Sequence, residues 1–276
     1  MATPPLLEAD DLTFTYAGQD RPTLEHIDLT VQAGELVVLA GATGSGKSTL
    51  LNCLTGVAPE HTGGRLTGNL RYRGQCIASW TIRQRSRAMG MMLQNVETQL
   101  FTDRVSEELI FGLENWNLPP GDIQDRTQTA LCEFDLASHR DRAIHQLSAG
   151  QKQRLLLACL STHQPSLLLL DEPFRFLDQA GVHQLLDLIQ RRTRQGQGVL
   201  VIEHRLELLK PVCDRAYRLA SGRLFPWDLG AAPSPRPLDA APKPPPKASG
   251  PIRLQTENLS WGGYPAFLQP RGVAIG

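Results

Sequence analysis

The sequence predicts an α/β domain built around a mostly parallel central sheet, and two observations support this prediction. Short, continuous apolar runs are typical of strands that are covered on both faces, and they occur at residues 36–40, 167–170 and 199–202. Helical patterns alternate with these runs, at residues 151–160 and 182–192. Apolar strands that alternate with helices form parallel sheets, because the helices serve as crossover connections.

Charge and cysteine content exclude several classes of protein. Lys plus Arg (28) equals Asp plus Glu (28) in the 276 residues, so no broad cationic face for nucleic acid is expected. The five cysteines are scattered without a CxxC pair, which is typical of a reduced cytosolic protein. The longest apolar run, 155–160, is far shorter than the ~20 residues of a transmembrane helix. An acidic N-terminus does not resemble a signal peptide, so we expect a cytoplasmic chain.

Proline marks one domain boundary. Eight of the 20 prolines fall between Pro233 and Pro251, where helix and central strand are excluded. We therefore predict a domain at 1–229 and an extended linker at 230–251. Within the domain, the opening residues up to Val31 alternate like antiparallel strands.

Residues 252–276 follow the linker and contain an echo of the N-terminus. LQTENLSW at 254–261 has the pattern of LEADDLTF at 7–14. The echo indicates the first strands of a second copy of the domain; the alternative is a coincidental amphipathic strand. Because the chain stops before a second phosphate loop, a second nucleotide-binding half would come from another chain, or this chain is a truncated product.

A phosphate-binding loop follows the apolar run at 36–40. It fits G-x-x-x-x-G-K-[ST] and comprises Gly41, Ala42, Thr43, Gly44, Ser45, Gly46, Lys47, Ser48 and Thr49. Glycines let backbone N–H groups converge on phosphate oxygens, and the following helix adds the positive end of its dipole. We expect Lys47 to contact the β- and γ-phosphates and Ser48 to ligate Mg²⁺. The loop predicts binding of a nucleoside triphosphate.

Two carboxylates follow the apolar run at 167–170. Asp171 and Glu172 lie at the end of a predicted parallel strand, where ligand sites form in α/β sheets. Asp171 is expected to hold Mg²⁺, and Glu172 to orient and deprotonate the attacking water. An ordinary turn, favoured by Pro173, is the alternative for this pair in isolation.

With these motifs in place, residues 6–229 resemble the ATP-binding cassette (ABC) family of P-loop ATPases. The sequence LSAGQ resembles the family signature LSGGQ and contains Ser148, Ala149, Gly150 and Gln151. The resemblance implies an antiparallel β subdomain, a helical signature subdomain, and a head-to-tail dimer in which the signature meets the partner's ATP. It also implies that Gln94 senses Mg²⁺ and the water nucleophile, that His204 contacts the γ-phosphate, and that Tyr16 stacks on adenine.

A narrower resemblance concerns residues 94–112. QNVETQLF followed by VSEELIFG is similar to the corresponding region of energy-coupling factor (ECF) transporter ATPases, although Arg104 replaces a Thr. These ATPases drive uptake of vitamins or transition-metal ions. The resemblance implies a second ATPase subunit or domain, a transmembrane scaffold subunit contacted through about 95–112, a substrate-capture subunit, and a peripheral location on the cytoplasmic face of the membrane. We expect Val105 and Leu109 to be buried, and Leu100 and Phe101 to line an exposed apolar groove.

Two departures from the family pattern concern the dimer interface. Ala149 replaces the first glycine of the signature, and Phe174, Arg175 and Phe176 replace the small residues usual in the D-loop. Two alternatives to a transport ATPase therefore stay open. One is a soluble cassette protein acting on ribosomes or DNA, and the other is a nucleotide-binding subunit that no longer hydrolyses ATP.

Overall fold

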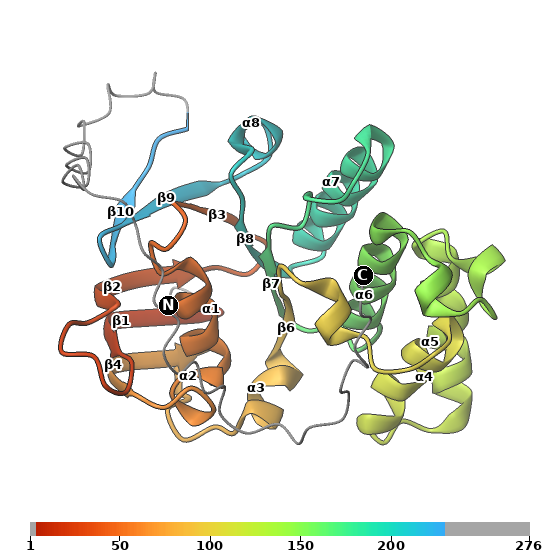
Figure 1. The fold of residues 1–276 in the computed structure, drawn as a ribbon, viewed down its shortest axis with the longest axis horizontal. Helices are drawn as coiled ribbons and strands as arrows, with labels where there is room; N and C mark the ends of the chain where they lie inside the picture. Colours follow the sequence, from red (N-terminus) through yellow and green to blue (C-terminus); the bar gives the residue numbers. More distant parts are fainter. Residues whose placement is uncertain (1–3, 230–276) are drawn as a thin grey trace, which may run out of the picture. The chain divides into compact units, whose positions relative to one another are not determined.

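The computed structural model describes residues 4–229, so the predicted linker at 230–251 and the predicted remnant at 252–276 lie outside the described residues. The described part contains two sheets (Figure 1). The first is antiparallel, in the order β2-β1-β4-β5, with β1 Leu7–Thr15, β2 Leu24–Val31, β4 Arg65–Tyr72 and β5 Gln75–Cys76. Its first two strands are the predicted antiparallel opening segment.

The second sheet has the order β10-β9-β3-β8-β7-β6. Its strands are β3 Leu36–Ala40, β6 Met89–Met92, β7 Leu167–Asp171, β8 Gly198–Ile202, β9 Arg215–Ala220 and β10 Arg223–Pro226. All neighbouring pairs are parallel except β10 with β9. Every residue of β3, β7 and β8 is buried, which confirms the interpretation of the three apolar runs.

Helices cover both faces of this parallel sheet. The helices of the described residues are α1 Lys47–Thr55, α2 Val57–Glu60, α3 Ile82–Ala88, α4 Val105–Asn115, α5 Pro120–Glu133, α6 Ala149–Thr162, α7 Gln179–Arg194 and α8 Leu206–Leu209. Short 3₁₀ turns are η1 Val96–Gln99, η2 Ala137–His139 and η3 Ile144–Gln146. None of the helices in residues 4–229 is both long enough and apolar enough to cross a membrane.

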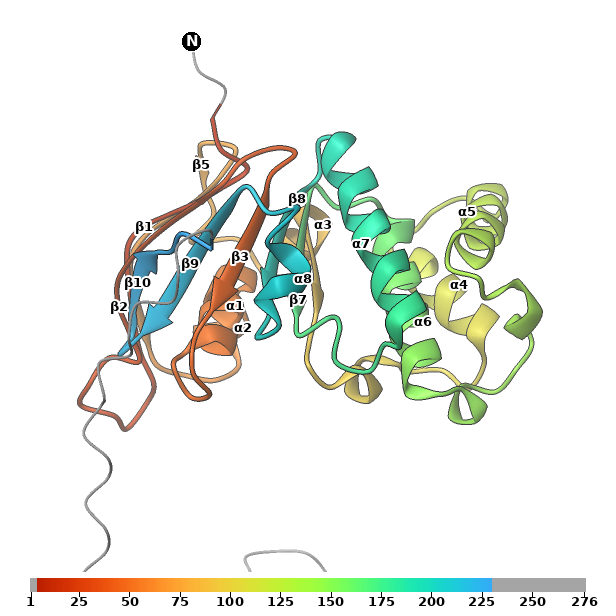
Figure 2. The ribbon, with the colours of Figure 1, turned by 90° about the horizontal axis from the view of Figure 1, so that it is seen from above.

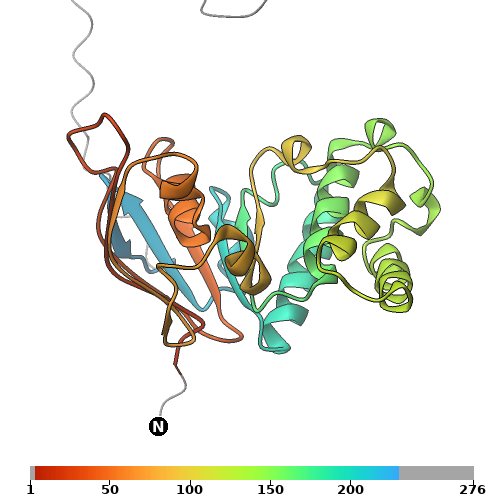
Figure 3. The ribbon, with the colours of Figure 1, turned by 90° about the horizontal axis from the view of Figure 1, so that it is seen from below.

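Two separate cores explain why the central strands are apolar up to Asp171 at the end of β7. Successive residues of a strand point to opposite faces. Val37 and Leu39 of β3 pack with α1 and the antiparallel sheet, whereas Leu36 and Val38 pack with α4 to α7. Figure 3 shows α1 between the antiparallel sheet and β3, and Figure 2 shows α6 and α7 on the other face with α4 and α5 beyond them.

The expected fold class is confirmed, with its parallel sheet, antiparallel β subdomain and helical subdomain. The predicted helices at 151–160 and 182–192 lie within α6 and α7. Strands β9 and β10 were not predicted, because polar residues interrupt their apolar pattern: β9 reads Arg-Ala-Tyr-Arg-Leu-Ala. They lie toward one edge of the sheet, where one face needs less apolar cover.

Candidate functional site

The phosphate loop connects β3 to α1, and two of its glycines are required by the backbone. Gly46 lies directly before α1 with φ of 103°, a left-handed conformation that side chains disfavour. A Cβ on Gly41 would lie 2.5 Å from the carbonyl oxygen of Leu219, so that position has no room for a side chain. The loop therefore turns tightly after β3, and the N-terminus of α1 points into the space that the loop encloses.

Lys47 is the first residue of α1, and its side chain folds back over the loop. Its Nζ donates hydrogen bonds to the carbonyl oxygens of Gly41 (2.8 Å) and Ala42 (2.9 Å). Burial lowers the pKa of Lys47, and the carboxylates of Asp171 and Glu172 oppose that shift. The ammonium group thus lies where the loop backbone would surround a phosphate.

Ser48 and Asp171 place a hydroxyl next to a carboxylate. Ser48 Oγ donates to Asp171 Oδ2 at 3.0 Å, linking α1 to the end of β7. Burial raises the pKa of Asp171, and the hydrogen bond from Ser48 partly offsets this. Residues 4–229 contain no group of three or more His, Cys, Asp or Glu residues that could hold a metal. The oxygen pair nevertheless fits Mg²⁺, which is commonly held by one or two protein oxygens together with substrate phosphates.

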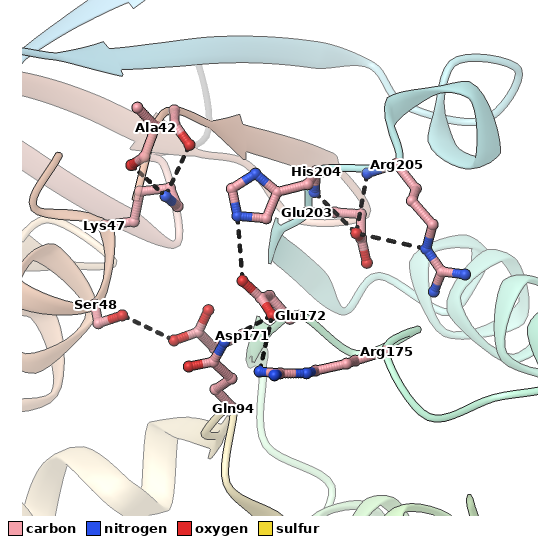
Figure 4. Close-up of polar contacts among 11 residues, drawn as sticks. Ala42, Lys47, Ser48, Gln94, Asp171, Glu172, Arg175, Glu203, His204 and Arg205 are labelled. Carbon is pink, nitrogen blue, oxygen red and sulfur yellow. Dashed lines mark hydrogen bonds and ion pairs between the residues drawn. The ribbon is translucent and has the colours of Figure 1, made fainter. Parts of the chain in front are cut away.

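Glu172 lies at the centre of a set of polar side chains that come from separate elements (Figure 4). Its Oε2 accepts a hydrogen bond from Gln94 Nε2 at 2.7 Å, and its Oε1 lies 3.1 Å from His204 Nε2. Glu172 has φ of 51°, a conformation that costs a non-glycine residue about 1–3 kcal/mol. Its N–H donates to the carbonyl oxygen of Ile202, which fixes this turn against β8.

His204 follows β8 and is oriented by its neighbour Glu203. The buried Glu203 carboxylate accepts hydrogen bonds from the backbone N–H groups of His204 (2.8 Å) and Arg205 (3.0 Å). Strands β7 and β8 are adjacent and parallel, so their carboxyl ends bring Glu172 and His204 together. The structure therefore gathers Lys47, Ser48, Gln94, Asp171, Glu172 and His204 at one end of the parallel sheet.

Tyr16 lies beside the start of α1. Its hydroxyl is 3.0 Å from Thr49 Oγ1, and its ring packs edge-on against Phe14 at 4.8 Å between centroids. The side chain is half-buried, so part of the ring remains available. Stacking of this ring on adenine stays a prediction.

The signature residues form the start of α6 and do not join the set around Glu172. Ser148 Oγ accepts from the Gln151 N–H (3.3 Å), and Gln151 Oε1 accepts from the Ser148 N–H (2.9 Å), which is a capping box. Ala149 is exposed and Gly150 is half-buried. Contact between these residues and the nucleotide of a partner subunit stays a prediction.

The unusual D-loop is divided between the core and the surface. Phe174 is fully buried, whereas Phe176 is 47% exposed. Arg175 lies over the Phe176 ring, and its guanidinium is 3.5 Å from Glu172 Oε2. Sequence reasoning identified Arg175 as a departure but missed its contact with Glu172, which the i, i+3 spacing in a tight turn could have indicated.

The expectation for Leu100 and Phe101 was wrong in part. Leu100 is half-buried and packs against the helical core, whereas Phe101 is 74% exposed and lies 6.2 Å from the ring of Phe111. Leu100 has extended backbone, with φ of −104° and ψ of 124°, in which adjacent side chains point to opposite sides. Val105 and Leu109 are fully buried, as predicted. The exposed rings border a groove of about 510 Å³ that is also lined by Ile82, Trp116, Leu156 and Leu160.

A phosphate loop, a strand-end carboxylate pair and two polar strand-end residues around one α/β sheet define a P-loop nucleotide-binding protein. Residues 24–175 match the family model described as ABC transporter. The chain belongs to this ABC transporter family.

Known proteins of similar sequence also carry the name of this family. A putative ABC transporter ATP-binding protein of Methanosarcina acetivorans is 35% identical over 220 residues, which is 79% of this chain and 34% of the relative. One from Streptomyces avermitilis is 36% identical over 229 residues, 83% of this chain and 41% of the relative. The chain thus spans well under half the length of these curated relatives.

Solved structures show the same fold. CbiO1 from Clostridium perfringens, described as part of the ABC transporter complex CbiONQ, superposes with a TM-score of 0.72 and 26% identity, over 80% of this chain and 87% of that one. An ATP-binding subunit of an ABC transporter superposes with a TM-score of 0.71 and 27% identity, over 81% and 90% respectively.

Proposed function

We propose that this chain is the ATP-binding and hydrolysing subunit of an ECF-type membrane importer that takes up a vitamin or a transition-metal ion. The observation that carries the proposal is the convergence of Gln94 and His204 on Glu172 beside Lys47 and Asp171. In addition, the structural neighbour CbiO1 belongs to a multi-subunit transporter complex.

Each residue of the set has a distinct part in the proposed reaction. Lys47 and the N–H groups of the loop bind the β- and γ-phosphates, while Ser48 and Asp171 hold Mg²⁺ with Gln94 nearby. Glu172 takes a proton from the attacking water, and His204 steadies the γ-phosphate. Tyr16 supports the adenine ring. Ser148, Ala149, Gly150 and Gln151, at the start of α6, act on the ATP of a second cassette, as their resemblance to the family signature implies.

Phe101 and Phe111 form the proposed contact with the membrane subunit. Both rings are exposed at the rim of an apolar groove, and exposed apolar surface of this kind usually marks a partner site. The proposed occupant is a cytoplasmic helix of the transmembrane scaffold, whose apolar face fills the groove. The chain would then work on the cytoplasmic face of the membrane, with the capture subunit reached indirectly.

Loss of hydrolysis is the alternative that a specific feature favours. Arg175 places a cation beside the Glu172 carboxylate, a contact that the usual small D-loop residues could not make. Purification of the tagged chain from detergent-solubilised membranes, with mass spectrometry and an ATPase assay on the complex, tests both points. The proposal predicts small integral membrane proteins and ATP hydrolysis. Recovery with ribosomes or DNA, or a complex that binds ATP without hydrolysing it, would contradict it.

A further inference from the structure

The segment between Gln94 and α4 is fixed at its start by the side chain of Gln99. Gln99 Oε1 accepts a hydrogen bond from the Leu93 N–H at 2.7 Å, and its Nε2 donates to the Met91 carbonyl oxygen at 3.1 Å. Met91 belongs to β6, the last strand of the sheet, and Leu93 follows that strand directly. The carboxamide therefore closes residues 93–99 into a short loop against the sheet.

A second side chain, Glu108 of α4, fixes the end of the segment. Its Oε2 accepts hydrogen bonds from the N–H groups of Phe101 (2.9 Å) and Thr102 (2.7 Å) and from Thr102 Oγ1 (2.9 Å). Glu108 is only 5% exposed, so these donors compensate its desolvated charge. Its position in the first turns of α4 also suits a negative charge.

These bonds decide which way the two apolar residues point. Holding the N–H groups of Phe101 and Thr102 toward α4 leaves Leu100 against the core and turns Phe101 outward beside Phe111. Phe101 is 74% exposed and has little packing of its own to hold it. Its direction therefore depends on the backbone bonds to Glu108.

We propose that Glu108 is a positioning residue for partner docking: it presents the Phe101 ring at the groove for a helix of the transmembrane subunit. The inference rests on the proposed docking function and goes beyond it by naming what sets the docking geometry. Glu108 lines the same groove but is only 5% exposed, and its Oε2 is occupied by the hydrogen bonds from the loop.

Four variants of the full chain and one matched control separate this role from general stability. Glu108→Leu keeps bulk but removes the acceptor, whereas Glu108→Gln keeps one acceptor oxygen. Phe101→Ser removes the presented ring, and the double variant E108L/F101S tests whether Glu108 acts through it. Glu114→Leu is the matched control, because Glu114 is an exposed carboxylate on the same helix. Should Glu108→Leu not fold, Glu108→Asp, which is one methylene too short, replaces it.

Two measurements are made on each variant. Hydrogen exchange of the 100–103 backbone reports the loop, and E108L is expected to raise the rate about tenfold or more while E108Q stays near wild type. Binding to inverted vesicles of the source cell, stripped of peripheral proteins, reports docking. E108L is expected to weaken binding about tenfold, E108Q and E114L by less than about twofold, and the double variant by no more than F101S alone.

The outcomes distinguish the positioning role of Glu108 from the proposed docking through Phe101 and Phe111. If F101S loses vesicle binding while E108L binds like wild type, or if the two changes add fully, the positioning role is wrong and the docking surface stands. Wild-type binding by F101S, or equal binding of the wild-type chain to liposomes of the extracted lipids, overturns the docking surface and with it the inference.

Discussion

The nucleotide-binding end of the molecule and the helical side with the proposed docking groove differ in whether their key side chains find partners within one chain. At the carboxyl ends of the parallel strands, Lys47, Asp171 and Glu172 all have polar partners within the chain. On the helical side, Phe101 and Phe111 lie exposed at a groove. ATP binding at the first region can therefore be tested on the isolated chain, whereas the proposed docking at the second region can be tested only with a partner protein.

The largest effect on binding or stability is expected at the nucleotide end, from Lys47→Ala. A charge-assisted contact with phosphate contributes about 1.5–3 kcal/mol, so ATP affinity should fall roughly tenfold to a hundredfold. Equilibrium binding of a fluorescent ATP analogue measures this change. Unaltered affinity in a folded variant would mean that Lys47 does not face the phosphates.

Two smaller and unequal effects on stability are expected beside the proposed docking groove. Leu100→Ser removes a half-buried side chain from the helical core and should lower the free energy of unfolding by about 1–2 kcal/mol. Phe101→Ser changes an exposed residue and should alter it by less than about 0.5 kcal/mol. Urea denaturation of both variants checks the contrast, and equal destabilisation would show that Phe101 also belongs to the core.

The smallest effect concerns pH and His163, which lines the same groove. Burial lowers the pKa of His163, and its ring stacks on Trp116 at 5.5 Å between centroids. The unfolded chain therefore takes up a proton that the folded chain resists. The free energy of unfolding therefore has its full value above the ordinary histidine pKa of about 6.5. It decreases as the pH falls toward the lower pKa of the folded chain, because protonation then favours the unfolded chain.

The measurement for His163 is the difference between two pH profiles of the free energy of unfolding. Between pH 7.5 and 5.5 the free energy of unfolding should fall more steeply in the wild type than in His163→Phe, because phenylalanine removes the titrating group but keeps the stacking. Identical slopes for the two proteins would mean that His163 titrates alike in the folded and unfolded chains.

The same two regions also differ in how many of their residue positions the sequence alone predicts. Lys47 and Glu172 were predictable, because a loop or a strand end places them through local chain geometry. Glu108 was not, since its partners at Phe101 and Thr102 depend on how one particular loop meets α4. Leu100 and Phe101 have similar hydropathy, so only the backbone direction reveals that one faces the core and the other the groove.

The central claim, that Glu172 is the base of an ATP-hydrolysing site, is tested most directly by single-turnover hydrolysis in wild type and Glu172→Gln. The amide keeps the shape of the side chain and can still contact Gln94, but it cannot accept a proton. The account predicts unchanged ATP affinity and a hydrolysis rate lower by about a hundredfold or more. Hydrolysis by Glu172→Gln at the wild-type rate would contradict it.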